Sequence, residues 1–150
     1  MDAVDQKVFS QFQSMIEATM ATGETCAESI GSAAEKIASA LLAGNRVFTC
    51  GEHSSSLVAQ LLTDYLSQGY EIDRPGFPSL NLNQIAQQSG AAERYNQALK
   101  TQAASGDILV LLSGGDNSNL LLGALNTALD RGMSIVLIST ANDDLLINLV

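Results

Sequence analysis

Two continuous apolar runs, separated by a helical pattern, restrict the possible folds of this chain more than any other feature. They are Asp107–Leu112 (DILVLL) and Ser134–Ser139 (SIVLIS). A run without polar alternation is typical of a strand covered on both faces, as in a parallel sheet. The segment between them, Asn117–Arg131, has helical spacing and stops at Gly132. Strand, helix and strand in this order predict a parallel βαβ unit.

The same alternation extends over most of the chain. Arg46–Cys50 predicts a short buried strand, Ser54–Gln68 a helix, Ser79–Leu82 a weaker strand, Ala91–Ala103 a helix and Asp143–Val150 the start of a last helix. Right-handed crossovers place such helices on both faces of the sheet. We therefore expect an α/β fold with three layers (α/β/α) and a parallel sheet, with any ligand bound beyond the carboxyl ends of the strands.

The N-terminal segment, Asp2–Ala43, has helical spacing throughout. Gly23 and Thr25 interrupt it, so we expect a pair of helices, the second of which ends at Gly44-Asn45. The first carries an apolar stripe that includes Phe9, Phe12, Met15 and Met20. Such a stripe is more often part of a core, but burial against another subunit is the competing interpretation.

Length, charge and cysteine content exclude several classes of protein. A chain of 150 residues predicts one domain, and its formal charge of −9 argues against direct nucleic-acid binding and against binding to an anionic membrane. No apolar run approaches the roughly 20 residues of a membrane span, and the N-terminus does not resemble a signal peptide. Cys26 and Cys50 lack metal-site spacing, so we expect reduced thiols and a cytoplasmic protein.

Two loops that follow predicted strands are the candidate ligand site. They are Gly51–Ser56 (GEHSSS) and Ser113–Ser118 (SGGDNS), each of which places glycine and hydroxyl groups just before a helix. Free backbone N–H groups and the positive end of a helix suit a phosphate. Helix capping by the same residue types is the alternative. The candidate ligand-binding residues are Ser54, Ser55, Ser56, Ser113, Asn117 and Ser118.

Acidic residues make these loops unfavourable for phosphate. Glu52 and Asp116 lie in or beside them. Two like charges about 5 Å apart repel by roughly 3 kcal/mol at an effective dielectric constant near 20, which is comparable to the gain from two charge-assisted hydrogen bonds. We expect Asp116 to cap its own helix, and a neutral, hydroxyl-rich ligand or a cation to suit the loops better.

His53 is the only histidine of the chain and a weak catalytic candidate. It could act as a general base, or as a metal ligand with Glu52 or Asp116, but a loop histidine bonded to a carbonyl or exposed to water is the alternative. The sequence supplies no set of three or four metal ligands, and nothing selects one serine as a nucleophile. Arg74 could reach a ligand or a neighbouring subunit, or bond backbone carbonyls.

Four segments together resemble a known family. They are VFTCGEHSSSLVAQLLTDYL, RPGFPSLNLN, GDILVLLSGGDNSN and RGMSIVLIST. In order and content they are similar to the SIS (sugar isomerase) domain, in the branch that holds the phosphoheptose isomerases and the DnaA initiator-associating protein. The resemblance covers essentially the whole chain and implies a single domain over 1–150 with the flavodoxin-like SIS fold. Residues 1–44 would be helices used for assembly and 45–150 the α/β core.

Departures from the family pattern bear on activity. Phosphoheptose isomerases carry a His and, four residues later, a Glu on the helix after the first loop, where this chain has Leu61 and Tyr65. The serine-rich phosphate loop becomes Ser113–Asp116, and the acidic site loop has no match in QIAQQSGAAERY. We expect the chain to lack the family's last strand and its C-terminal helix, with its Gln and His ligands, which have no counterpart up to Val150. We therefore expect no zinc, no other cofactor and no catalytic residue of the isomerase type.

The resemblance implies a non-catalytic SIS-domain protein that binds a carbohydrate derivative, a protein partner, or both. Like the initiator-associating protein, it would act in replication control as a homo-oligomer, a tetramer in most of the family, with a replication initiator as partner. The alternative is a sedoheptulose 7-phosphate isomerase with a relocated base such as His53. A third interpretation is a sugar-binding sensor that performs no turnover.

Overall fold

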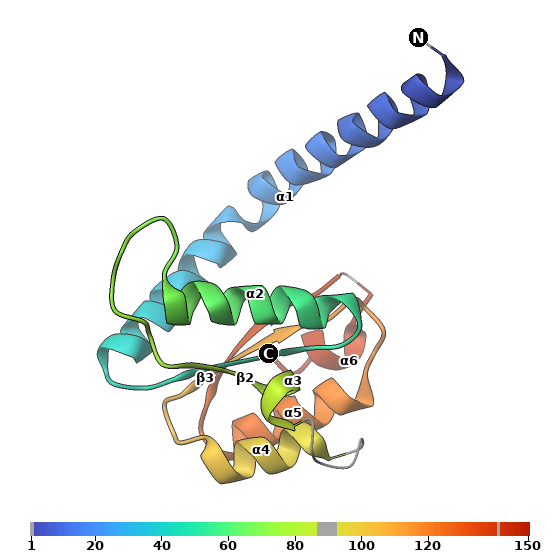
Figure 1. Cartoon of the computed structure of the whole chain (residues 1–150). Helices are drawn as coiled ribbons and strands as arrows, with labels where there is room; N and C mark the ends of the chain where they lie inside the picture. Colours follow the sequence, from blue (N-terminus) through green and yellow to red (C-terminus); the bar gives the residue numbers. More distant parts are fainter. Residues whose placement is uncertain (1, 87–92, 141) are drawn as a thin grey trace. The chain divides into compact units, whose positions relative to one another are not determined.

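The computed structural model describes residues 2–86, 93–140 and 142–150 (Figure 1). The chain divides into two compact units, Met1–Lys36 and Ile37–Val150. The start of the helix predicted over Ala91–Ala103 and half of the segment QIAQQSGAAERY lie outside the described residues.

The second unit contains a four-stranded sheet in which all strands are parallel. The strands are β1 (Val47–Gly51), β2 (Ser79–Asn81), β3 (Ile108–Leu112) and β4 (Ser134–Ile138), in the spatial order β2-β1-β3-β4. Thr49 of β1 aligns with Asn81 of β2 on one side and Val110 of β3 on the other, and Val110 aligns with Val136 of β4. The predicted parallel βαβ architecture is confirmed.

Strand position explains which apolar runs are covered on both faces. Every residue of β1 and β3, the two central strands, is buried. In β4, Ser134 and Ile138 are exposed, because this strand pairs with β3 on one side and no described strand pairs with the other. The apolar run at Ser134–Ser139 therefore predicted strand β4 correctly, but the expectation that both faces of this strand are covered was wrong.

Helices cover both faces of the sheet, so the predicted three-layer α/β/α arrangement is also confirmed. On one face, α2 (Ser54–Gln68) packs together with the last turns of α1, through a cluster that includes Val47, Ile108, Val110, Leu62, Leu66, Ile37 and Leu41. On the other lie α3 (Leu82–Ile85), α4 (Arg94–Gln102), α5 (Asn119–Asp130) and α6 (Asp144–Ile147) (Figure 1). Their cluster includes Phe48, Leu109, Leu111, Tyr95, Leu99, Leu121, Leu125 and Leu146.

The N-terminal region is helical as predicted, but it forms one helix instead of two. Helix α1 runs from Ala3 to Leu42 without a break, and Asp2 caps its start by accepting from the N–H groups of Val4 (2.7 Å) and Asp5 (2.9 Å). A glycine inside a helix costs about 1 kcal/mol relative to alanine, which a helix this long tolerates. The hydroxyl of Thr25 bonds the carbonyl of Ala21 (2.8 Å) within the helix, so it does not start a turn.

In the part of the chain that the structure describes, no helix combines the length and the apolar character needed to cross a membrane.

Candidate functional site

The carboxyl ends of the parallel strands bring three strand-to-helix loops to one edge of the sheet. These loops follow β1, β3 and β4. At Gly51, the last residue of β1, an added Cβ would lie 2.6 Å from the carbonyl oxygen of Ser55 and 3.0 Å from that of Leu112. Only glycine therefore permits the first loop to pass so close to the end of β3.

In the loop after β1, the helix cap is His53 and not a serine. His53 adopts φ 51°, and its carbonyl accepts from the Ser56 hydroxyl at 2.6 Å. The His53 and Ser54 side chains are exposed, whereas Ser55 and Ser56 are half-buried. Among the described residues the imidazole forms no hydrogen bond, so its suggested role as a base or ligand stays a prediction.

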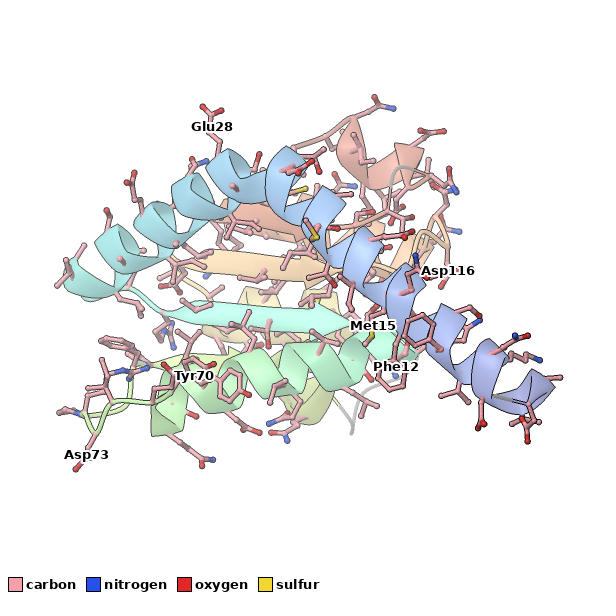
Figure 2. All side chains as sticks on the ribbon, turned by 90° about the horizontal axis from the view of Figure 1, so that it is seen from above. Phe12, Met15, Glu28, Tyr70, Asp73 and Asp116 are labelled. Atoms are coloured by element: carbon pink, nitrogen blue, oxygen red, sulfur yellow. The ribbon has the colours of Figure 1, made fainter. Side chains whose placement is uncertain are left out.

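The loops after β1 and β3 lie against one another. An added Cβ on Gly114 would lie 4.0 Å from Ser55 Oγ and 3.7 Å from Asp116 Oδ2. Asp116 is exposed at the end of the sheet toward which the strands run (Figure 2). It does not cap α5 as we predicted, because the cap is Ser118, whose Oγ accepts from the N–H of Leu121 at 3.2 Å. The carboxylate of Asp116 and the hydroxyl of Ser55 therefore both lie near Gly114.

The hydroxyl of Ser113 is used inside the protein. Ser113 is buried; its hydroxyl donates to the carboxylate of Asp143 and accepts from the N–H of Gly115 at 3.2 Å. Ser139 donates to the same carboxylate oxygen of Asp143 at 3.1 Å. Asp143 is 0% exposed, and its other oxygen has no hydrogen-bond partner among the described residues. No local signal in the sequence singled out Asp143, which appeared only as the start of a predicted helix.

Asn117 and Ser118 also hold the β3–α5 loop in place. Asn117 adopts φ 50°; its Oδ1 accepts from the N–H of Leu145 at 3.2 Å, and its amide donates to the carbonyl of Asn142 at 3.4 Å. An added Cβ on Gly115, which has φ 89°, would lie 2.1 Å from Thr140 Oγ1. Four of the six predicted ligand-binding residues therefore use their side chains in the bonds described above. The hydroxyls of Ser54 and Ser55 take part in none of these bonds.

A second polar cluster fixes the end of β1 from the opposite side. The side chain of Asn83 accepts from the N–H of Gly51 at 3.2 Å and donates to its carbonyl at 2.7 Å and to the hydroxyl of Tyr95 at 2.6 Å. Arg94 donates to the same hydroxyl at 3.2 Å and lies over the Tyr95 ring. The sequence did not reveal this cluster, because no local pattern connects Gly51 with residues 32 and 44 positions later.

Cys50, which precedes Gly51 in β1, and Tyr95 both have raised pKa values, which favours their neutral forms. Burial raises the pKa of the Cys50 thiol, the charge of Glu52 adds to the rise, and Arg94 opposes it. Burial also raises the pKa of Tyr95, with smaller contributions from its charged neighbours. Cys50 is therefore a packing residue rather than a thiolate nucleophile.

The outer face of α2 is apolar. The resemblance implies that catalytic isomerases carry their metal-binding His and Glu at these positions. Leu61 is 47% exposed and Tyr65 41% exposed; Leu57, one turn earlier, is also exposed. The Tyr65 ring packs at 4.6 Å from that of Tyr70. Hydrocarbon and phenol groups do not suit zinc, which takes imidazole, thiolate and carboxylate ligands. No group of three or more His, Cys, Asp or Glu that could hold a metal is found in residues 2–86, 93–140 and 142–150.

Arg74 bonds backbone carbonyls at the end of α2, the second of the interpretations left open by the sequence. Its guanidinium donates to the carbonyls of Tyr65 (2.9 Å) and Leu66 (3.1 Å) and stacks at 4.1 Å over the ring of Phe77. The same carbonyls accept from the N–H groups of Gly69 (3.1 Å) and Phe77 (2.9 Å), so Arg74 adds a second donor to each at the end of the helix.

Known proteins are similar to this chain in sequence and in fold. The SIS domain model matches residues 11–140. The phosphoheptose isomerases of Shewanella piezotolerans and Shewanella pealeana are 32% and 31% identical over 138 residues, which is 87% of this chain and 70% of theirs.

Two solved structures of phosphoheptose isomerases have a similar fold. A phosphoheptose isomerase from Francisella tularensis superposes with a TM-score of 0.83 at 27% identity, over 97% of this chain and 80% of that one. The enzyme from Neisseria gonorrhoeae has a TM-score of 0.81 over 95% of this chain and 79% of that one, and at 18% identity it supports the fold alone. The chain belongs to the SIS domain family, with phosphoheptose isomerases among its homologues.

Proposed function

We propose that this protein is a non-catalytic SIS domain that binds a carbohydrate derivative at the loops after β1 and β3. The observation that carries the proposal is the apolar outer face of α2, where Leu61 and Tyr65 stand in place of the imidazole and the carboxylate that the resemblance would require for metal binding and proton transfer. Binding without turnover is the function we infer for a site that combines the free hydroxyls of Ser54 and Ser55 with this apolar face of α2.

The negative charge of Asp116 favours an uncharged ligand over a phosphate ester at these loops. Asp116 is exposed and lies, like Ser55, near Gly114, and the N–H of Gly115 is already bonded to Ser113 Oγ. A phosphate there would meet a carboxylate and would lose one of the donors that a phosphate cradle needs. A hydroxyl-rich, uncharged sugar can donate to Asp116 and accept from Ser54 and Ser55, so we expect it to bind better than its phosphate ester.

Calorimetry tests this proposal directly. The natural protein and Asp116→Ser are each titrated with sedoheptulose 7-phosphate and with sedoheptulose. We expect the natural protein to prefer the free sugar and Asp116→Ser to gain affinity for the phosphate by about tenfold, the equivalent of 1.4 kcal/mol. Tighter binding of the phosphate by the natural protein would contradict the assigned ligand class.

The alternative function is sugar-phosphate isomerisation with His53 as a relocated base. It is favoured by the 32% identity to a phosphoheptose isomerase. The test is to follow conversion of sedoheptulose 7-phosphate by NMR with the natural protein and His53→Ala. Turnover that disappears in His53→Ala would establish the enzyme, and binding without turnover would support the sensor-like function.

We further propose that the protein is cytoplasmic and acts as a homo-oligomer, a tetramer, whose surface engages a protein partner such as a replication initiator. The uncovered apolar stripe of α1 supports self-association. Direct nucleic-acid or membrane binding is not expected at a net charge of −9. Light scattering after size exclusion tests the oligomer, because a monomer at micromolar concentration would remove its basis.

A further inference from the structure

Asp143 is a buried carboxylate that is bonded to hydroxyl groups and forms no ion pair within the described residues. It is 0% exposed, and one of its oxygens, Oδ2, accepts from the hydroxyls of Ser113 and Ser139. The other oxygen has no hydrogen-bond partner in the part of the chain that the structure describes. A buried charge is costly unless opposite charges or hydrogen bonds compensate for it. The donors that hold Asp143 therefore identify a place in the protein that accepts an anion.

The buried donor, Ser113, belongs to the loop between β3 and α5, one of the two loops in which the sequence places the candidate ligand site. The N–H of Gly115 bonds the hydroxyl oxygen of Ser113 at 3.2 Å, and this hydroxyl donates in turn to Asp143. The loop leads into α5, a helix of 12 residues whose positive end also favours negative charge. The loop therefore holds an anion, and this anion is a side chain of the protein itself.

Main-chain bonds keep Asp143 in this position. On one side of it in the chain, the carbonyl of Asn142 accepts from the amide of Asn117 at 3.4 Å. On the other side, the N–H of Leu145 donates to Asn117 Oδ1 at 3.2 Å. The carbonyl of Asp143 accepts from the N–H of Leu146, whose side chain is buried in the core. The carboxylate is therefore held by α6 and by the β3–α5 loop together.

We propose that Asp143 is a specificity-determining residue that excludes phosphate and other anionic groups from the β3–α5 loop. Its carboxylate takes the hydroxyl proton of Ser113, which a phosphate bound at this loop would need. A phosphate would have to displace Asp143 and would also be repelled by its charge. An uncharged sugar avoids both obstacles, because the hydroxyls of Ser54 and Ser55 remain free for it. This role deepens the proposed function and rests on it for the position of the ligand.

Asp143 and Asp116 act against phosphate in different ways, and salt distinguishes them. Asp116 is exposed, so its charge is screened over about 8 Å at physiological ionic strength. Asp143 is buried, and it acts by occupying a donor as well as by its charge. We therefore expect the phosphate affinity gained by Asp116→Ser to shrink with added sodium chloride more than the affinity gained by Asp143→Ala.

Chemical rescue with inorganic phosphate tests the proposal. Asp143→Ala removes the internal anion and frees Ser113, while Asp144→Ala changes the net charge equally at an exposed neighbour. Thermal unfolding of the natural chain and both variants is compared in sodium phosphate and in sodium chloride at equal ionic strength and pH. We expect phosphate to raise the unfolding temperature of Asp143→Ala alone, and calorimetry to show at least about tenfold tighter phosphate binding than by the natural chain. If Asp143→Ala is unfolded in chloride, recovery of its folded circular dichroism signal in phosphate is the same result.

Formate is the second probe, because it is close in size to the carboxylate that Asp143→Ala removes. Rescue by formate but not by phosphate would show a closed packing cavity and would overturn the proposal. Equal stabilisation of all three proteins by phosphate, or no rescue by either anion, would overturn it as well. Sedoheptulose is titrated onto the natural chain in parallel. If phosphate rescues Asp143→Ala and the sugar does not bind, the proposed function fails and the exclusion of anions by Asp143 stands.

Discussion

The hydroxyl of Ser113, at the end of β3, donates a hydrogen bond to the carboxylate of Asp143, at the start of α6. Both side chains are buried, and Ser139 donates to the same carboxylate. One acidic residue therefore holds the ends of two neighbouring strands, and the shape of the β3–α5 loop depends on a residue 30 positions later in the chain.

Removing this acceptor should destabilise the protein. Asp143→Ala leaves the buried hydroxyl of Ser113 without its acceptor, whereas Ser139 keeps the carbonyl of Thr140 at 3.0 Å, and we expect a loss of about 1–3 kcal/mol in the free energy of unfolding. Urea denaturation followed by circular dichroism measures it. The control is Asp144→Ala, an exposed neighbour, for which the loss should stay below about 1 kcal/mol. Equal losses would show that the buried bonds contribute nothing specific.

The hydroxyl pair between β1 and α2 offers a second test. Thr49 Oγ1 and Thr63 Oγ1 lie 2.6 Å apart in the core, and Asn81 donates to Thr49 at 3.3 Å. Thr63→Val keeps the shape and removes one hydroxyl, so unfolding should become easier by about 1–2 kcal/mol. In Thr101→Val, where an exposed hydroxyl bonds the carbonyl of Gln97, we expect less than about 0.5 kcal/mol. The prediction fails if the exposed change is the costlier one.

Cys50 should make stability fall at alkaline pH. Burial raises its pKa in the folded protein, so the folded state keeps a proton that the unfolded chain releases above about pH 8.5. The stabilisation is complete below that pH, and above it stability falls by up to about 1.4 kcal/mol per pH unit. Unfolding measured between about pH 7.5 and 10, on either side of the usual thiol pKa, should show a shallower slope in Cys50→Ala. An unchanged slope would assign the effect to other groups, of which Tyr95 is the first candidate.

Arg74 should not be replaceable by lysine. Its planar guanidinium bonds the carbonyls of Tyr65 and Leu66 while stacking on Phe77, and a lysine ammonium cannot do both. We expect Arg74→Lys to lose about 1–2 kcal/mol. Amide hydrogen exchange should accelerate at the end of α2 around Gly69 and remain unchanged in α5. Faster exchange throughout the sheet would instead indicate global destabilisation.

The sequence predicted the elements well because their signals are local. The apolar runs at β1 and β3 and the helix Ser54–Gln68 depend on neighbouring residues, and each is found where it was predicted. The expected break at Gly23 was wrong because a single glycine costs only about 1 kcal/mol, which a helix of 40 residues tolerates.

The site was predicted less well because its decisive contacts are distant in sequence. Serine and asparagine in a glycine-rich loop can either face a ligand or hold the loop, and the loop sequence alone does not distinguish the two. Ser113 holds the loop because its hydroxyl bonds Asp143. Asn117 holds the loop because its side chain bonds the main chain of Leu145 and Asn142. Asn83 was quoted only as part of a family motif, although its side chain bonds both main-chain groups of Gly51.

The strand order also restricts the order in which the sheet can fold during synthesis. Val47 of β1 pairs with Ile108 of β3, and everything between them must be synthesised before the two central strands can meet. Until then β1 can pair only with β2, which has three residues, so a nascent chain exposes a row of unpaired main-chain groups and apolar side chains. Contacts this distant slow folding and prolong exposure to aggregation. The assembly of the sheet therefore requires the synthesis of β3, and a chaperone that shields β1 would act before β3 emerges.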